Sequence, residues 1–275
     1  MRLEQCAFWG IAQCQEGDTS VIVLEAEAGL ANRMRAIASA VALSDKFNTK
    51  LVVMWPLDDS LNCEFYNLFA PIKGVLLIHG KSLLERALRK MCKLQCKHTF
   101  IHATAADAGQ IEAEMREGSV YIRTYSAFYP ADGFECFQPV DSVLEKVRSI
   151  LPEDCSNLVG VHIRRTDNAE SISRSPTELF ERAIKTEIEK NPNAQFYLAT
   201  DSAEEQQRLI SIFGTRIIVN ASKTLSRKTQ QGMVDALVDL ICLSRTTKIF
   251  GSYWSSFSET AAALGKTELI VLQNP

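Results

Sequence analysis

Short apolar runs alternate along the chain with longer segments in which apolar residues recur every three or four positions. Runs bounded by glycine or polar residues are typical of buried strands, and the longer period is typical of helices with one buried face. After residue 150 the pattern predicts strands at 158–165, 194–201, 215–220, 248–252 and 268–272, and helices at 175–190, 203–213, 230–245 and 255–264. This alternation favours a parallel sheet with helices on its faces.

The part of the chain before residue 150 repeats the alternation less regularly. Its predicted strands lie at 21–24, 50–55, 74–79 and 119–125, and its predicted helices lie at 30–47, 82–91 and 140–151. Residues 1–20 show no clear period, and Pro152 closes the last of these helices. We therefore expect an α/β protein with two Rossmann-like halves, residues 1–150 and 151–275.

The predicted strand at 158–165 ends in charge, since it carries His162, Arg164 and Arg165 and is followed by Asp167. Ligands bind at the carboxyl edge of parallel sheets. Two adjacent arginines cannot both be buried unpaired, because their charge persists at any working pH. Their forked donors suit a phosphate or a carboxylate, so the segment predicts an anion site. The alternative is a solvated basic turn in which one arginine pairs with Asp167.

A second anion site is predicted where the strand at 21–24 runs through Gly29 into a helix that begins with Asn32, Arg33 and Arg35. A strand, a glycine turn and a helix N-terminus together form the usual cradle for phosphate. Cations in the first turn oppose the helix dipole, so a bound anion would offset their cost. In the alternative interpretation, Arg33 and Arg35 face water.

Two further strand ends carry polar residues that precede a predicted helix. Thr200, Asp201 and Ser202 end the strand at 194–201, and the strand at 248–252 is followed by a serine-rich turn made of Ser255, Ser256, Phe257 and Ser258. Such residues commonly cap helices, but they also surround phosphates at helix N-termini. On the helix at 230–245, Asp235 and Asp239 share one face, which is either a solvated acidic face or part of a site.

These stretches together resemble the motifs of the fucosyltransferase superfamily, which includes the α1,6-fucosyltransferases, the nodulation fucosyltransferases and the protein O-fucosyltransferases. His-Ile-Arg-Arg-Thr-Asp at 162–167 resembles its His-x-Arg-Arg-x-Asp motif, and the segments at 29–35, 199–201 and 255–258 resemble three further motifs in the expected order along the chain. The resemblance implies a GT-B-like fold, in which two Rossmann-like halves face a cleft. It places the acceptor on residues 1–150 and GDP on residues 151–275.

The resemblance also implies an activity, namely inverting, metal-independent transfer of fucose from GDP-fucose to a glycan or protein hydroxyl. Arg165 and Arg164 would stabilise charge on the β-phosphate, and Glu170 would accept the proton of the hydroxyl. The substrate-binding residues would be Asn32, Arg33, His162, Asp167, Thr200, Asp201, Ser202, Asp239, Ser255, Ser256, Phe257 and Ser258. The alternatives are another nucleotide sugar, a non-catalytic nucleotide-sugar-binding protein and a plain α/β interaction module.

Composition narrows the possible partners. A net charge of -3 does not favour nucleic acid, and no apolar run is long enough to span a membrane. No targeting segment is recognisable, which predicts a cytoplasmic protein; the alternative is a secretory-pathway protein from which the membrane anchor has been removed. The chain has 8 cysteines; a zinc site at Cys92, Cys96, His98 and His102 is conceivable, but scattered thiols more often fill cores. We expect no cofactor and no metal.

Overall fold

The computed structural model describes residues 20–80, 82–166, 168–226 and 228–274. Within these ranges the chain forms two compact units. The first unit contains the described residues up to Asp58 together with Pro71–Gln138, and the second contains Asp59–Ala70 and the chain from Pro139 onward. In the described part of the chain, no helix combines the length and the apolar character that crossing a membrane requires.

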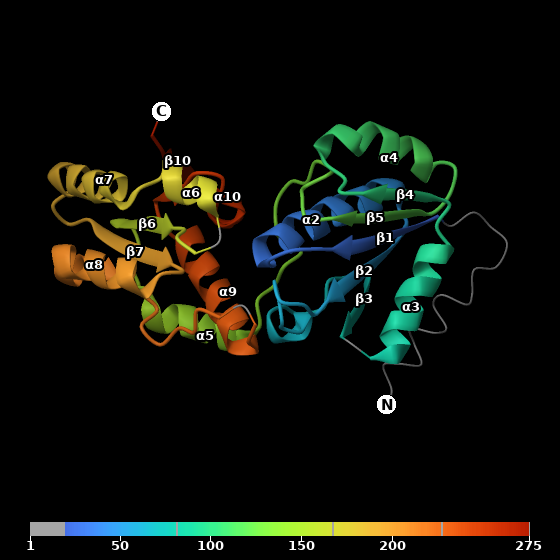
Figure 1. Cartoon of the computed structure of the whole chain (residues 1–275), viewed down its shortest axis with the longest axis horizontal. Coiled ribbons are helices and arrows are strands. Elements are labelled where there is room, and N and C mark those ends of the chain that lie inside the picture. Colours follow the sequence, from blue (N-terminus) through green and yellow to red (C-terminus); the bar gives the residue numbers. More distant parts are fainter. Residues whose placement is uncertain (1–19, 81, 167, 227, 275) are drawn as a thin grey trace. The chain divides into compact units, whose positions relative to one another are not determined.

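The first unit is built on a parallel five-stranded sheet of order β3-β2-β1-β5-β4 (Figure 1). Its strands are β1 (Val21–Ala26), β2 (Lys50–Pro56), β3 (Val75–Gly80), β4 (His98–Ile101) and β5 (Val120–Thr124). Its helices are α2 (Leu30–Phe47), α3 (Leu83–Leu94) and α4 (Ala108–Met115), with a short 3-10 turn at Ala105–Asp107. The strand order changes direction at β1, so the ends of β1 and β5 mark the point at which such sheets bind ligands.

The second unit holds another parallel five-stranded sheet, of order β10-β9-β6-β7-β8. Its strands are β6 (Leu158–Ile163), β7 (Gln195–Thr200), β8 (Ile217–Ile218), β9 (Lys248–Ser252) and β10 (Glu268–Leu272). Its helices are α5 (Asp141–Ile150), α6 (Ala169–Arg174), α7 (Thr177–Lys190), α8 (Ala203–Phe213), α9 (Gln230–Ser244) and α10 (Ser256–Gly265), with 3-10 turns at Phe65–Asn67 and Gly214–Arg216.

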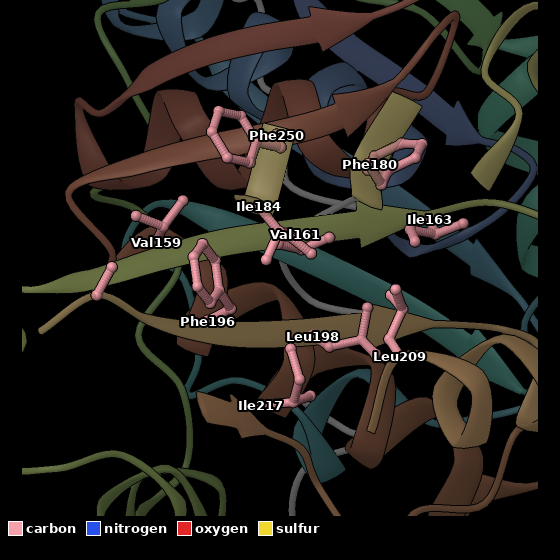
Figure 2. Close-up of a cluster of buried hydrophobic side chains, with 11 residues drawn as sticks. Val159, Val161, Ile163, Phe180, Ile184, Phe196, Leu198, Leu209, Ile217 and Phe250 are labelled. Atoms are coloured by element: carbon pink, nitrogen blue, oxygen red, sulfur yellow. The ribbon is translucent and has the colours of Figure 1, made fainter. Parts of the chain in front are cut away.

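The core of the second unit surrounds β6, which is buried over its full length. Figure 2 shows Val159, Val161 and Ile163 of this strand among aromatic and aliphatic side chains from its neighbours. These neighbours are Phe180, Ile184, Phe196, Leu198, Leu209, Ile217 and Phe250. Because this core ends at Ile163, the polar residues that follow it emerge at the carboxyl edge of a rigid sheet.

The α/β class and the two parallel sheets predicted from the hydrophobic pattern are confirmed. The sequence did not predict β4, α4 or α6, which are short and partly exposed and therefore carry little periodic signal. The predicted strand at 215–220 is reduced to β8, because a 3-10 turn takes up the residues before it.

The compact units differ in extent from the predicted halves. Helix α5, expected to close the first half, packs on α9 in the second unit, where Lys146 contacts the carboxylate of Asp235. Residues 59–70 also join the second unit, because the Val140 amide donates to the Leu68 carbonyl. The acceptor and nucleotide roles of the two halves stay predictions.

Candidate functional site

The two adjacent arginines after β6 point in different directions. Arg165 turns into the second unit, where it donates to the carbonyls of Arg164 (2.7 Å) and Ser175 (2.9 Å) and to the Thr177 hydroxyl (2.9 Å). Its Nε lies 3.6 Å from a Glu205 oxygen, and burial lowers its pKa. Arg165 therefore fastens the end of β6 to the starts of α7 and α8, and protein groups take up much of its hydrogen-bonding capacity.

Arg164 lies across the ends of the neighbouring strands. Its backbone amide donates to the Ser252 hydroxyl at the end of β9 (3.0 Å), and its Nη1 lies 3.1 Å from Asp201 Oδ2, just after β7. The side chain is only 15% exposed. A cation held at the meeting point of β6, β7 and β9 is well placed to face an anion at this edge of the sheet.

Asp201 holds the loop that follows β6. One oxygen accepts from the Arg165 amide (2.7 Å), and the other accepts from the amide (3.3 Å) and hydroxyl (2.7 Å) of Thr166 as well as contacting Arg164. The cap of α8 is instead Ser202, whose hydroxyl accepts from the Glu205 amide at 3.3 Å. The capping interpretation is therefore correct for Ser202, whereas Asp201 binds the loop after β6 that contains Arg164 and Arg165.

A buried ion pair lies at the end of β7. The two oxygens of Asp239 accept from the Tyr197 hydroxyl (2.6 Å) and from Lys223 Nζ (3.1 Å), and Lys223 also donates to the Thr200 carbonyl (2.9 Å). Burial raises the pKa of Asp239, and Lys223 opposes that rise. Sequence analysis missed Lys223, because a single lysine in a loop carries no signal that separates it from a solvated one.

The carboxylate one helical turn earlier holds the same loop. Asp235 accepts from the Thr224 amide (2.8 Å) and from Gln231 Nε2 (3.1 Å) and also contacts Lys146. Asp235 and Asp239 are both buried, so the interpretation of this face of α9 as a solvated acidic face is wrong. The two carboxylates together fix Lys223 and Thr224 beside the strand ends.

His162 is a neutral, buried imidazole beside the start of α10. Its ring centroid lies 4.9 Å from that of Phe257, and burial and the nearby Arg164 lower its pKa to about 3. Its Nδ1 has no hydrogen-bond partner among the described residues. A buried ring nitrogen without a partner costs free energy, and this nitrogen is itself shielded from solvent.

The N-terminus of α10 presents backbone amides to the same region. Ser255 is the N-cap, but its side chain makes no capping bond, and Ser258 is buried with its hydroxyl donating to the Ser255 carbonyl (3.2 Å). Ser256 and Phe257 in the first turn are partly exposed. First-turn amides and the helix dipole attract anions, so this terminus complements Arg164.

The predicted general base, Glu170, lies in the first turn of α6. Its carboxylate is 3.3 Å from Arg174 Nε one turn later, and its side chain is more than half exposed. Asn168 caps α6 and also donates to the Trp254 carbonyl at 3.0 Å, which ties α6 to the turn before α10. Asp167 lies outside the described residues. The catalytic role of Glu170 stays a prediction.

In the first unit, Arg33 is fully buried. It donates to the carbonyls of Ala28 (2.7 Å) and Pro56 (2.5 Å) and to Asp58 Oδ2 (2.9 Å), and burial lowers its pKa to about 10. The interpretation that Arg33 faces water is therefore wrong. The side chain joins the loops after β1 and β2, and its predicted contact with substrate stays a prediction.

The turn before α2 differs from a glycine-dependent one. Ala28 adopts the left-handed conformation with φ 63°, whereas Gly29 is extended and serves as the N-cap. Asn32, also predicted to bind substrate, accepts from Arg35 Nη2 at 2.8 Å. The Arg33 bond to the Ala28 carbonyl stabilises this strained turn.

The conceivable zinc site at Cys92, Cys96, His98 and His102 does not assemble. Among the described residues, the one group of three or more His, Cys, Asp or Glu side chains close enough to share a metal ion is His98 with Glu114 and Glu117. Cys92 is buried in the core of the first unit, and burial raises the pKa of Cys96 to about 12. The two cysteines are core thiols, as the alternative interpretation had it.

Comparisons of the whole fold identify related structures. NodZ α-1,6-fucosyltransferase soaked with GDP-fucose matches with a TM-score of 0.60 and 16% identity over 90% of this chain and 93% of that one. A mutant of Arabidopsis thaliana FUT1 in complex with GDP matches with a TM-score of 0.63 and 16% identity over 99% of this chain and 75% of that one. POFUT1 in complex with GDP matches with a TM-score of 0.53 and 10% identity, over 93% and 99%.

No model of a protein family matches the chain, and no curated protein matches it in sequence. The structural matches therefore show the fold, which is fucosyltransferase-like. At this level, the resemblance predicted from the four motifs is confirmed.

Proposed function

We propose that the protein is a fucosyltransferase, which transfers fucose from GDP-fucose to a hydroxyl of a glycan or a protein. One observation carries the proposal: Arg164, His162, Asp239 of α9 and the N-terminus of α10 lie around the carboxyl ends of β6, β7 and β9 in one sheet. The structural neighbours with the same fold were solved with GDP-fucose or GDP.

In the proposed complex, the diphosphate binds the amides at the start of α10 and the guanidinium of Arg164. The base binds beside Asp239 and His162. Each oxygen of Asp239 accepts one hydrogen bond, from Tyr197 or from Lys223, and each can accept another. The oxygens of Asp201 already accept hydrogen bonds from Arg165 and Thr166. A carboxylate can accept from both N–H groups on the edge of guanine, which adenine does not offer.

The proposed reaction is a direct displacement with inversion. The acceptor oxygen bonds to C1 of fucose, the bond from C1 to the β-phosphate oxygen breaks, and its electron pair stays on the phosphate. Arg164 stabilises that charge where it develops, and Arg165 keeps Arg164 and its loop in place through its bonds to Ser175 and Thr177. Glu170 is the proposed acceptor of the hydroxyl proton.

We further propose that the reaction needs no divalent metal, since Arg164 and the helix terminus supply the positive charge that a metal would otherwise provide. The GT-B arrangement, with the acceptor on the first unit across a cleft, is part of the same proposal. A transferase of this fold acting on another nucleotide sugar and a non-catalytic nucleotide-sugar-binding protein are the alternatives.

The test is GDP-fucose hydrolysis by the purified protein in the presence of a chelator, followed by NMR. The account predicts slow release of fucose whose first-formed anomer is opposite to that of the donor. It also predicts a loss of about a hundredfold or more in Arg164→Met, on the scale of other charge-stabilising groups. Binding of GDP-fucose without any turnover would support the binding protein instead, and release of the retained anomer would contradict inversion.

A further inference from the structure

Helix α3 exposes an unusual amount of apolar surface. Leu83 is 81% exposed, Leu94 75%, Leu84 50% and Met91 44%, and Ala87 between them is also exposed. At 100° per residue, these five positions occupy roughly one third of the helix circumference along its whole length. Other exposed large apolar residues of the described chain lie elsewhere in ones and twos, which is normal for a surface.

This exposed strip is separate from the face that holds α3 on its sheet. Cys92 is buried and Leu88 is partly buried against a cluster that contains Val23, Val52 and Tyr121. These two positions lie one turn apart on the neighbouring part of the helix circumference. Removing the exposed leucines therefore leaves the contacts that anchor α3 in place.

The opposite border of the strip is cationic. The helix carries four basic residues, Arg86, Arg89, Lys90 and Lys93, and one acidic residue, Glu85, so its net charge is +3 (four minus one) in a chain whose total is -3. Arg89 donates to the Gly80 carbonyl and Lys93 lies over the Tyr121 ring, so Arg86 and Lys90 are the cations that border the strip. Glu85 is engaged in the capping box with Ser82 at the helix start. Arg86 and Lys90 form no ion pair within the described ranges, so their charge is available to a partner.

We propose that α3 is a docking surface for an anionic lipid bilayer. An apolar strip bordered by arginine and lysine on a surface helix is the arrangement of helices that lie in the interface of membranes, with the strip among the acyl chains and the cations at the headgroups. A second copy of this chain is a poorer occupant, because it would bring one +3 helix against another. Nucleic acid would satisfy the cations but not the leucines.

The experiment uses the full chain and vesicles of phosphatidylcholine, with and without phosphatidylglycerol, in a flotation assay. We expect binding to vesicles that contain phosphatidylglycerol and loss of that binding at high salt. Leu83→Ser with Leu94→Ser, and separately Arg86→Glu with Lys90→Glu, should each lower the partition coefficient about tenfold or more. The matched control, Ile212→Ser with Val271→Ser, removes exposed apolar residues from the second unit and should leave binding unchanged.

Three results would overturn the proposal. These are equal binding to neutral and anionic vesicles, no binding to either, and retention of binding in both α3 variants. Light scattering of the same proteins adds a fourth: a dimer that dissociates in the leucine variant would make a second copy the occupant of the strip. Unchanged thermal unfolding of the variants ensures that a loss of binding does not reflect a loss of fold.

Discussion

The contact between Lys223 and Asp239 yields a prediction about how a buried ion pair makes the stability of the protein depend on pH. Both side chains are at most one tenth exposed, and Lys223 Nζ lies 3.1 Å from Asp239 Oδ2. Charges at about 3 Å attract by roughly 5 kcal/mol at an effective dielectric constant of about 20, and desolvation offsets part of this. Removing one partner of a buried pair typically costs about 3–5 kcal/mol.

Lys223→Met keeps the aliphatic stem and removes the charge, so the buried Asp239 carboxylate loses its ion pair. Burial already raises the pKa of this carboxyl, and Lys223 lowers it again. Without Lys223 the pKa rises further, and the folded state holds a proton that the unfolded state releases. The penalty therefore grows as the pH rises from the unfolded pKa through the folded one and shrinks at acid pH.

The assay is urea unfolding of the wild type and of Lys223→Met at one acid pH and one mildly alkaline pH, at both of which the wild type is folded. We expect the variant to lose about 3 kcal/mol at the higher pH and clearly less at the lower one. Tyr197, Asp235 and Cys242 are the other titratable groups near Asp239. The double variant Lys223→Met/Asp239→Asn should abolish the pH dependence, and an equal loss at both pH values would refute this reasoning.

Three further predictions concern buried contacts in the two units. Arg33→Met should destabilise the protein by about 3 kcal/mol in urea unfolding, because it removes three hydrogen bonds of a fully buried guanidinium, to the Ala28 and Pro56 carbonyls and to Asp58. A loss below about 1 kcal/mol would contradict this. Arg165→Met should lower both the melting temperature and GDP affinity, whereas an effect on turnover with an unchanged melting temperature would give Arg165 the direct catalytic role predicted from sequence. Gly160→Ala should lower the free energy of unfolding in urea by about 1–3 kcal/mol, since the new Cβ would lie 2.8 Å from Thr246 Oγ1. A variant as stable as the wild type would show that Thr246 can move aside at no cost.

The fold was largely predictable from sequence, because its strands are apolar runs separated by helices of clear period. Strand β6 illustrates this, since six buried residues are followed at once by charge. Helix α3 shows the limit of the same method. Its period predicted a helix, but the sequence did not say that Cys92 and Leu88 pack on the sheet while four large apolar residues stay exposed.

The motifs pointed to one edge of the second sheet, and the functional roles of the residues there stay predictions. The motifs drew attention to Arg164, Asp201 and Asp239, which the structure does bring to one edge of the second sheet. They could not distinguish an arginine that faces the edge from one that turns inward, as Arg165 does, because both have the same sequence context. Lys223 was missed for a related reason: its loop is placed by Asp235 and Asp239, which lie beyond it in the chain.

The most direct test of the central claim is calorimetric titration of the purified protein with GDP, ADP and UDP in the presence of a chelator. The account predicts tight binding of GDP, clearly weaker binding of ADP and UDP, and no requirement for a divalent metal. Asp239→Asn should reduce the preference for GDP over ADP. Selective binding of UDP would keep the fold and replace the donor, and failure to bind any of the three nucleotides would contradict the proposed site.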